Sequence, residues 1–541
     1  MNLIIGFILF FFQPVQGQIF TEKDSLRGNL SPERTWFDIN YYHLNLEVYP
    51  NTRSIAGYND VLFTVLEKSK MMQLDMFENM LIDSILYYGH ICQFERKYDA
   101  FFINFPFVLV PGDLKQIRIY YHGQPIEAKN PPWDGGFVWK EDTRDLPWIG
   151  VACQGLGASS WWPCKDHLSD EPDSMRITCS VPSEVQFIGN GNRENDTIIS
   201  GKRISTWKVS YPINPYNVSI NIANYSHLHD EYTGEKGSLS LDYYIMKGNE
   251  EKAQKQFKQV APMLAIYEDL FGPYPFWNDG YALVETPYLG MEHQSAIAYG
   301  NKFMPGYLGS FPGEMDFDFI VIHESGHEYW GNSVSMNDIS DMWIHESFCT
   351  YSEALYVEKI YGHEQMLNYL MYQKDFISGS SPITGHRNVN DKGNPIDMYY
   401  KGSWMLHSIR NTLANDSLWF SILKGISLEF ALKNCDGEEI ISFVNERAGM
   451  DFRPLFDQYL NYSTLPVLKY RLLKQNSHYI LDYKWSSDVK GFNMPIDICL
   501  FNQQVLRLCP SNKYQSISLE ISHSEELQFI DNNFLYEKNQ E

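Results

Sequence analysis

Two histidines four residues apart place the strongest constraint on this chain of 541 residues. His323 and His327 belong to the segment HESGH, and on an α-helix this spacing puts both imidazoles on one face. Two imidazoles placed in this way can hold one Zn²⁺ ion, and Glu324 beside them can serve as general base for an attacking water. The apolar run 319–322 precedes the first histidine, which indicates a helix buried in the protein interior.

Glu346 is the candidate for a third metal ligand. It follows His327 after eighteen residues, enough chain for a turn and the start of a second helix that returns its carboxylate to the metal. Two histidines and one glutamate leave a fourth position open, which is typical of a catalytic zinc site. Chance is the competing explanation for HESGH, and requiring Glu346 as well makes it much rarer. Glu353, seven residues further on the same face, is expected either to hold a ligand histidine or to be an ordinary surface residue.

The segments HESGHEYWGN and WIHESF resemble the motifs of peptidase family M1, the aminopeptidase N group of zinc aminopeptidases. The family pattern is HExxH, eighteen residues, and a glutamate in a NEGF-like segment. His345 and Ser347 stand here where that pattern usually has Asn and Gly. The resemblance implies a thermolysin-like α/β catalytic domain of the gluzincin type that binds one Zn²⁺ ion through His323, His327 and Glu346.

A second segment, LGMEHQ, is similar to the family's GAMEN element, an edge strand that pairs with the main chain of the peptide. Leu289 replaces the first Gly of that element and His293 replaces its Asn. The resemblance implies that Gly290, Met291 and Glu292 contact the substrate, with Met291 at the floor of the first side-chain pocket. A fixed carboxylate at Glu292 would bind a free α-ammonium and so set the distance from the chain end to the metal.

Two more site residues come from the same resemblance. The segment around WWPCKDHLSDEP has the composition of an ordered surface loop, yet it is similar to the family's PCxD and DEP segment. Gln154, directly after Cys153, matches a glutamine that family members use to meet the substrate's amino terminus. DMYYKG is similar to the family's YxKG element, which makes Tyr399 the catalytic tyrosine and its O–H a donor to an oxyanion. Tyr400 is the rival if the register differs by one.

The periodicity of apolar residues predicts a multidomain α+β chain. From about Asp38 to Asp230 the period is near two, as in His43–Val48, which predicts an all-β N-terminal domain over residues 18–230. After Tyr243 the period shifts towards 3.6, beginning with a helix over Glu250–Phe271, which predicts the mixed α/β catalytic domain over residues 231–463. Short strands return over 464–541 and predict a small C-terminal β-sandwich. Many family members continue into a large helical domain, so a less enclosed site is expected here.

Residues 1–17 predict a secretory signal peptide. Leu3–Phe12 is an apolar run too short to span a bilayer, and Val15-Gln16-Gly17 resembles a small-residue cleavage site. We expect the mature chain to begin near Gln18 and to be exported to the periplasm or the extracellular space. The segment before the apolar run lacks Lys and Arg, so a retained membrane anchor is the alternative. No later segment reaches the ~18 apolar residues of a membrane span.

Charge and cysteine content narrow the classes of partner. With 43 basic and 67 acidic residues the net charge is −24, which disfavours nucleic acids and anionic membranes as partners. Eight cysteines do not make a disulfide scaffold in a chain of this length. Cys499 and Cys509 flank an expected hairpin and are the better candidate pair, while Cys153 and Cys164 are a weaker one.

The resemblance implies a zinc aminopeptidase that acts on peptides with a free amino terminus. A zinc endopeptidase with the same ligands is one alternative, and it would cleave N-acetylated peptides equally well. A binding protein on an inactive peptidase scaffold is another. A related member of the family, leukotriene hydrolase, also opens an epoxide, and nothing in this sequence selects that activity. The sequence leaves the oligomeric state open.

Overall fold

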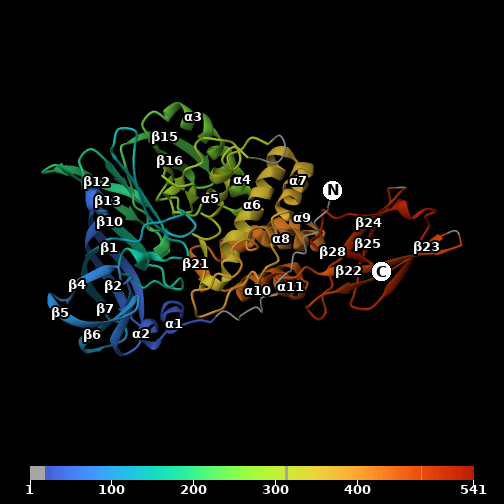
Figure 1. The fold of residues 1–541 in the computed structure, drawn as a ribbon, viewed down its shortest axis with the longest axis horizontal. Helices are drawn as coiled ribbons and strands as arrows, with labels where there is room; N and C mark the ends of the chain where they lie inside the picture. The colour runs from blue at the N-terminus through green and yellow to red at the C-terminus, as the bar shows by residue number, and fades with distance from the viewer. Residues whose placement is uncertain (1–18, 311–314, 477, 502) are drawn as a thin grey trace, which may run out of the picture.

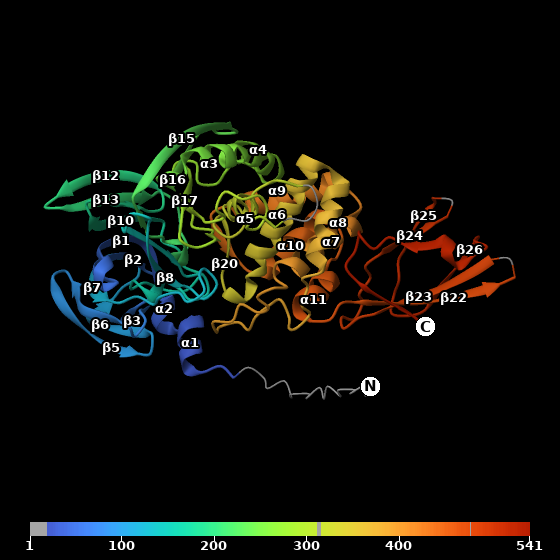
Figure 2. The same ribbon diagram turned by 45° about the horizontal axis from the view of Figure 1, so that its top comes forward.

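The computed structural model describes residues 19–310, 315–476, 478–501 and 503–541. The predicted signal peptide lies outside these residues. Three bodies follow one another along the long axis of the molecule, an N-terminal β body, a central helical body and a C-terminal β body (Figures 1 and 2). Within the described ranges, no helix is both long and apolar enough to cross a membrane.

A ten-stranded sheet dominates the N-terminal body. The short helices α1 (Glu22–Gly28) and α2 (Pro32–Thr35) precede it. Its central pair is antiparallel, with Phe37 opposite Val65, and buried residues alternate along the first strand, as the period of two predicts. In order across the sheet the strands are β12 (Asn192–Ile199), β13 (Lys202–Val209), β10 (Ser174–Pro182), β1 (Phe37–Tyr49), β2 (Ser54–Val65), β7 (Leu114–Gly123), β4 (Met80–Tyr87), β5 (His90–Lys97), β6 (Ala100–Leu109) and β3 (Ser69–Asp75).

A smaller four-stranded sheet completes this body and leads towards the central one. One of its strands, β9 (Pro147–Ala152), ends two residues before Gln154. The order is β11 (Gln186–Ile188), β14 (Asn221–Ala223), β9 (Pro147–Ala152) and β8 (Gly136–Glu141).

The central body begins with a five-stranded sheet. The boundary expected at residue 230 falls inside its first strand, because this strand pairs with the next one from Tyr225 onwards. The order is β15 (Tyr225–Gly234), β16 (Gly237–Met246), β17 (Tyr281–Glu285), β19 (Ile297–Tyr299) and β18 (Gly290–Met291), so the two-residue β18 lies at the edge. A further small sheet pairs β20 (Val334–Met336) with β21 (Lys433–Cys435).

Helices cover this sheet and carry the HESGH segment. α5 (Phe319–Gly326) begins where the carboxylate of Asp318 accepts hydrogen bonds from the first turn, and α6 (Trp343–Tyr361) ends at Gly362. The helix expected over 250–271 is interrupted by a 3₁₀ turn at Phe257–Gln259. The others are α3 (Glu250–Gln256), α4 (Val260–Phe271), α7 (His363–Lys374), α8 (Tyr400–Leu413), α9 (Asp416–Glu429), α10 (Gly437–Ala448) and α11 (Arg453–Asn461).

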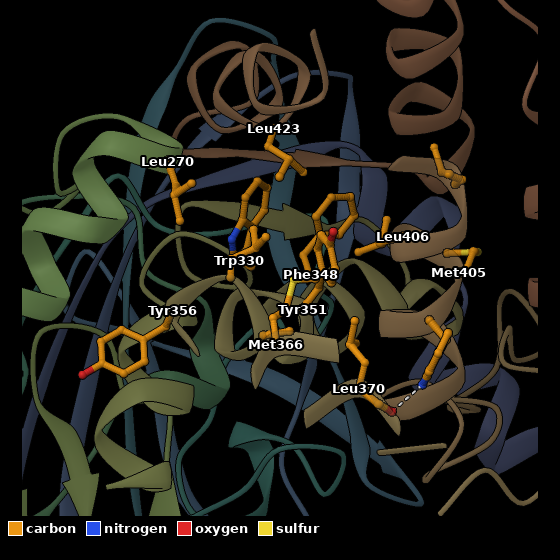
Figure 3. Close-up of a cluster of buried hydrophobic side chains, with 14 of the residues drawn as sticks. Leu270, Trp330, Phe348, Tyr351, Tyr356, Met366, Leu370, Met405, Leu406 and Leu423 are labelled. Atoms are coloured by element: carbon orange, nitrogen blue, oxygen red, sulfur yellow. Dashed lines mark hydrogen bonds between the residues drawn. The ribbon is translucent and has the colours of Figure 1, made fainter. Parts of the chain in front are cut away.

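A core of large apolar side chains fixes α6 in place (Figure 3). The ring of Phe348 stacks on that of Trp330, with centroids 4.7 Å apart. Full burial of each such side chain is worth roughly 1.5–3 kcal/mol, so α6 has little freedom to shift. The labelled members come from α4, α6, α7, α8 and α9 and from the loop after α5: Leu270, Trp330, Phe348, Tyr351, Tyr356, Met366, Leu370, Met405, Leu406 and Leu423.

The C-terminal body contains two sheets whose buried side chains join one core cluster. One sheet has the order β26 (Gln515–Leu519), β23 (His478–Ser486), β22 (Val467–Gln475) and β28 (Glu537–Gln540). The other has the order β25 (Val505–Leu508), β24 (Ile496–Leu500) and β27 (Leu527–Phe529).

All eight cysteines are free thiols, so the candidate pair Cys499 and Cys509 forms no disulfide. The reason is the register of the hairpin. Cys499 lies opposite Val505, whereas Leu508, the residue before Cys509, lies opposite Ile496. The two sulfurs therefore stand towards opposite ends of the strand pair. Cys153 and Cys164 are also unpaired and buried.

Candidate active site

The two histidines of α5 and the glutamate of α6 turn three donor atoms towards one point. His323 Nε2 and His327 Nε2 are 3.2 Å apart, and Glu346 Oε2 lies 3.7 and 3.3 Å from them. A tetrahedral zinc ion with ligand distances of ~2.0–2.2 Å needs donor atoms about 3.3 Å apart. Glu346 Oε2 is buried and accepts no hydrogen bond from the described residues. These donors therefore fit a single divalent cation of the zinc type.

Hydrogen bonds at the opposite ring nitrogens orient both imidazoles. His323 Nδ1 lies 2.6 Å from Glu353 Oε1, and His327 Nδ1 lies 2.9 Å from the carbonyl oxygen of Trp330. Each Nδ1–H donates to its oxygen, which leaves the Nε2 lone pair free for a metal. Glu353 is 1% exposed and accepts a second hydrogen bond from the Tyr369 hydroxyl. Of the two expectations for Glu353, the structure therefore supports contact with a candidate ligand histidine and not an ordinary surface position.

A thiol also lies close to the ring nitrogens. Cys349 has its Sγ within 4.8 Å of donor atoms of His323 and His327. Its S–H donates to the main-chain carbonyl of His323 at 2.8 Å. The contact ties α6 to α5 and gives Cys349 a structural role that the sequence did not indicate.

Glu324 faces a cavity of about 530 Å³ beside these donors. Burial raises the pKa of its carboxyl to about 7, a value suited to taking up and releasing a proton at neutral pH. Gly290 explains how the carboxylate is accommodated, because a β-carbon there would stand 2.5 Å from Glu324 Oε1. The glycine thus leaves room for the carboxylate as well as for a ligand.

The N-terminal and central bodies meet at a second pair of groups. Gln154, two residues beyond β9, donates from Nε2 to Glu292 Oε1 at 2.7 Å and to Glu346 Oε1 at 3.1 Å. Glu292 is 3% exposed, and burial raises the pKa of its carboxyl. Burial alone would also raise the pKa of Glu346, but the positive charge that His327 and His323 carry when protonated outweighs burial and lowers that pKa. Met291 lines the same cavity.

Tyr399 lies at the N-terminus of α8 with its hydroxyl over the metal donors. Its Oη donates to Glu346 Oε1 at 3.0 Å. Burial, followed by the charge of Glu346, holds the pKa of the phenol well above its ordinary value, so the O–H stays protonated. Tyr400 lines the cavity, but its ring packs against Phe376 at 5.3 Å between centroids. Of the two tyrosines, Tyr399 is the one that contacts the metal donors.

Tyr216 joins the site without any signal in the sequence. It lies in a 3₁₀ turn, Pro215–Asn217, and its hydroxyl donates to Glu292 Oε1 at 3.0 Å. The same hydroxyl lies 3.5 Å from Nδ1 of His345, whose Nε2 accepts a hydrogen bond from the Met336 N–H at 3.2 Å. Burial lowers the pKa of His345 to about 3, so the ring is neutral. The sequence showed that His345 replaces the Asn of the family pattern, but it did not show that Tyr216 is the neighbour of His345.

Comparison with known proteins gives low identities over long stretches. Leukotriene A-4 hydrolase of Xenopus laevis is 22% identical over 505 residues, covering 86% of this chain and 78% of that protein. Leucyl aminopeptidase of Saccharolobus solfataricus is 20% identical over 347 residues, covering 61% of this chain and 43% of that protein. The chain thus spans most of the first relative and less than half of the second.

Solved structures share the fold. An M1 zinc metallopeptidase from Deinococcus radiodurans superposes with a TM-score of 0.66 at 18% identity, covering 79% of this chain and 94% of that one. A mutant of the Deinococcus enzyme bound to a Tyr-Ser-Ala substrate superposes with a TM-score of 0.67, covering 81% and 98%. The likeness confirms the predicted α+β class.

The profile of the Peptidase family M1 domain matches residues 256–459. This stretch contains the three metal donors together with Glu292, Glu324 and Tyr399. Residues 256–459 are therefore identified as a Peptidase family M1 domain.

Proposed function

We propose that this protein is a zinc-dependent aminopeptidase that hydrolyses the first peptide bond of peptides with a free amino terminus. One observation carries the proposal: a buried carboxylate, Glu292, stands one side-chain amide away from the metal donor Glu346. A group that binds an α-ammonium then lies within one residue's length of the reacting carbonyl. One of the relatives is a leucyl aminopeptidase, which supports the same reaction class.

Substrate binding follows from charge and hydrogen bonding. Glu292 accepts a hydrogen bond from the α-ammonium. The side-chain oxygen of Gln154 can accept another, because among the described residues Gln154 forms side-chain hydrogen bonds through Nε2 alone. Tyr216 holds Glu292 in place. The main chain of β18, at the edge of its sheet, offers an unpaired side to which an extended peptide can add.

Bond cleavage uses the remaining groups. When bound, Zn²⁺ supplies Lewis acidity that polarises the first peptide carbonyl and lowers the pKa of the attacking water. Glu324 accepts a proton from that water and passes it to the leaving amine. The hydroxyl of Tyr399 donates a hydrogen bond to the oxyanion as charge develops on the carbonyl oxygen.

We also propose that the chain is exported and that residues 1–17 are removed as a signal peptide. The support is the apolar run followed by a small-residue site in the sequence. N-terminal sequencing of the secreted protein tests this, with Gln18 or a close neighbour as the expected first residue.

The activity is tested with a panel of aminoacyl-coumarin substrates on the mature protein, with and without a chelator. We expect hydrolysis of several members of the panel, loss of activity after chelation, and recovery when Zn²⁺ is returned. A protein that binds no zinc and cleaves no member of the panel would contradict the proposal and favour a binding role on this scaffold.

A further inference from the structure

One cation lines the catalytic cavity and has no part in the mechanism above. Lys392 belongs to the segment between α7 and α8, and its side chain borders the cavity together with Gln154 and Glu292. It is half-buried. Among the residues that the structure describes, no carboxylate lies within ion-pairing distance of its ammonium and no hydrogen bond involves it. A half-buried ammonium without a protein anion is available to an anionic group of a ligand.

The position of Lys392 places this charge at the amino-terminal end of a bound peptide. Its Nζ lies 3.9 Å from the point that a β-carbon on Gly155 would occupy. Gly155 follows Gln154, whose amide contacts Glu292. The segment is tied to this loop, since Asn390 Nδ2 donates to the carbonyl of Gly155 at 3.2 Å. Lys392 therefore stands beside the ammonium-binding groups.

The charges around the cavity indicate which kind of side chain Lys392 can bind. Apart from the two histidines, Lys392 is the one basic side chain among the described residues that line this cavity. A first residue with a basic side chain would bring a second cation towards Lys392, whereas an acidic side chain would pair with it. The α-ammonium of the same residue is already matched by Glu292. The protein charge that remains unmatched is thus the positive charge of Lys392, and an anionic group of the substrate would match it.

We propose that Lys392 selects peptides whose first residue is Asp or Glu. The proposal rests on the aminopeptidase function and names its substrate class. The carboxylate of the first side chain accepts a charge-assisted hydrogen bond from Lys392 Nζ while the α-ammonium binds Glu292. A glutaminyl first residue has the same shape without the charge, and it is the matched comparison. We expect a preference for glutamyl over glutaminyl substrates of about tenfold in kcat/KM.

The experiment uses aminoacyl-coumarins with Glu, Gln, Leu and Arg as the aminoacyl group, because this leaving group carries no carboxylate. Lys392→Met should lower kcat/KM for the glutamyl substrate about tenfold and leave the glutaminyl and leucyl substrates unchanged. Lys392→Glu should favour the arginyl substrate. Lys490→Met, at an exposed position in the C-terminal body, is the control and should change nothing.

Three outcomes overturn the inference while the aminopeptidase function stands. Wild-type enzyme that cleaves glutamyl and glutaminyl substrates equally removes the proposed preference. A Lys392→Met enzyme that is slower on all four substrates to the same degree gives the residue a structural role. The dipeptides Leu-Gly and Leu-Gly-amide are assayed beside the panel. A loss of activity in Lys392→Met that is confined to Leu-Gly and absent for Leu-Gly-amide assigns the lysine to a C-terminal carboxylate. If wild-type protein with zinc cleaves none of the substrates, it is the proposed function that fails.

Discussion

Gln154 and Glu292 come from different bodies of the molecule and meet at 2.7 Å, amide nitrogen to carboxylate oxygen. The same amide nitrogen reaches the metal donor Glu346 at 3.1 Å. One side chain of the N-terminal body thus bridges Glu292 and Glu346. The proposed exopeptidase action rests on this short spacing between the carboxylate proposed to bind the α-ammonium and the proposed metal ligand.

Glu324→Gln tests the general base. The substitution keeps the shape of the side chain but removes its ability to accept a proton, so kcat should fall by roughly 10²–10⁴-fold. The three metal donors are unchanged, and zinc content measured by atomic absorption should equal that of the wild type. Retained activity in a zinc-loaded variant would remove Glu324 from the mechanism.

Tyr399→Phe tests oxyanion stabilisation. The phenol donates to Glu346 Oε1 at 3.0 Å, so its hydroxyl lies beside the proposed metal donors. Loss of one such donor should lower kcat by about 10²–10³-fold with little change in KM. Tyr400→Phe is the matched control and should retain most activity. Equal losses in the two variants would contradict the assignment of the catalytic tyrosine.

Glu353→Gln tests the support of the metal site. Glu353 Oε1 accepts from His323 Nδ1 at 2.6 Å and so fixes the ring with its Nε2 turned to the metal. A glutamine at this position binds the ring more weakly, and zinc affinity should fall by about 10–100-fold. Competition with a zinc-responsive dye measures the change. Unchanged affinity would show that the packing around His323 is enough to orient it.

Glu328→Gln tests a dependence of stability on pH. Glu328 is fully buried, and burial raises the pKa of its carboxyl from 4.5 to about 8. Between these values the folded state holds a proton that the unfolded state has lost, so stability falls as pH rises through this window. The loss is at most about 1.4 kcal/mol for each pH unit.

Thermal melts between pH 5 and pH 9 check this expectation. The wild-type Tm should decline across the window more steeply than that of Glu328→Gln, whose amide does not titrate. Glu364→Gln, at an exposed position on α7, is the control and should follow the wild type. Parallel curves for wild type and Glu328→Gln would show that the buried carboxyl does not carry the effect.

Local pattern was enough to predict the elements that carry the metal donors. The spacing of His323 and His327 predicts a helix, and α5 extends up to His327. The break at Phe257–Gln259 was missed because the apolar periodicity continues through it. Whether Cys499 and Cys509 pair could not be decided from the sequence, because the hairpin register depends on the whole strand pair, which spacing alone does not reveal.

Site residues that lie far in sequence from the HESGH segment were harder to predict. Gln154 came only from a resemblance, since its own segment has the composition of an ordinary loop. Tyr216 and Lys392 stand in short irregular segments, and no periodicity or motif marks either of them. Their place depends on how the N-terminal body docks against the helices, which is a matter of packing between segments distant in the chain. The position of the Cys349 thiol beside the histidines also depends on packing between segments, here α5 and α6.

The ammonium-binding role of Glu292 beside the metal donors is the central claim, and one pair of substrates tests it. Leucyl-coumarin presents a charged amino terminus, whereas N-acetyl-leucyl-coumarin presents a neutral, bulkier one. The account predicts that zinc-loaded enzyme cleaves the first and leaves the second intact, with kcat/KM lower by at least about 10²-fold. Equal cleavage of both substrates would contradict it and identify the protein as an endopeptidase.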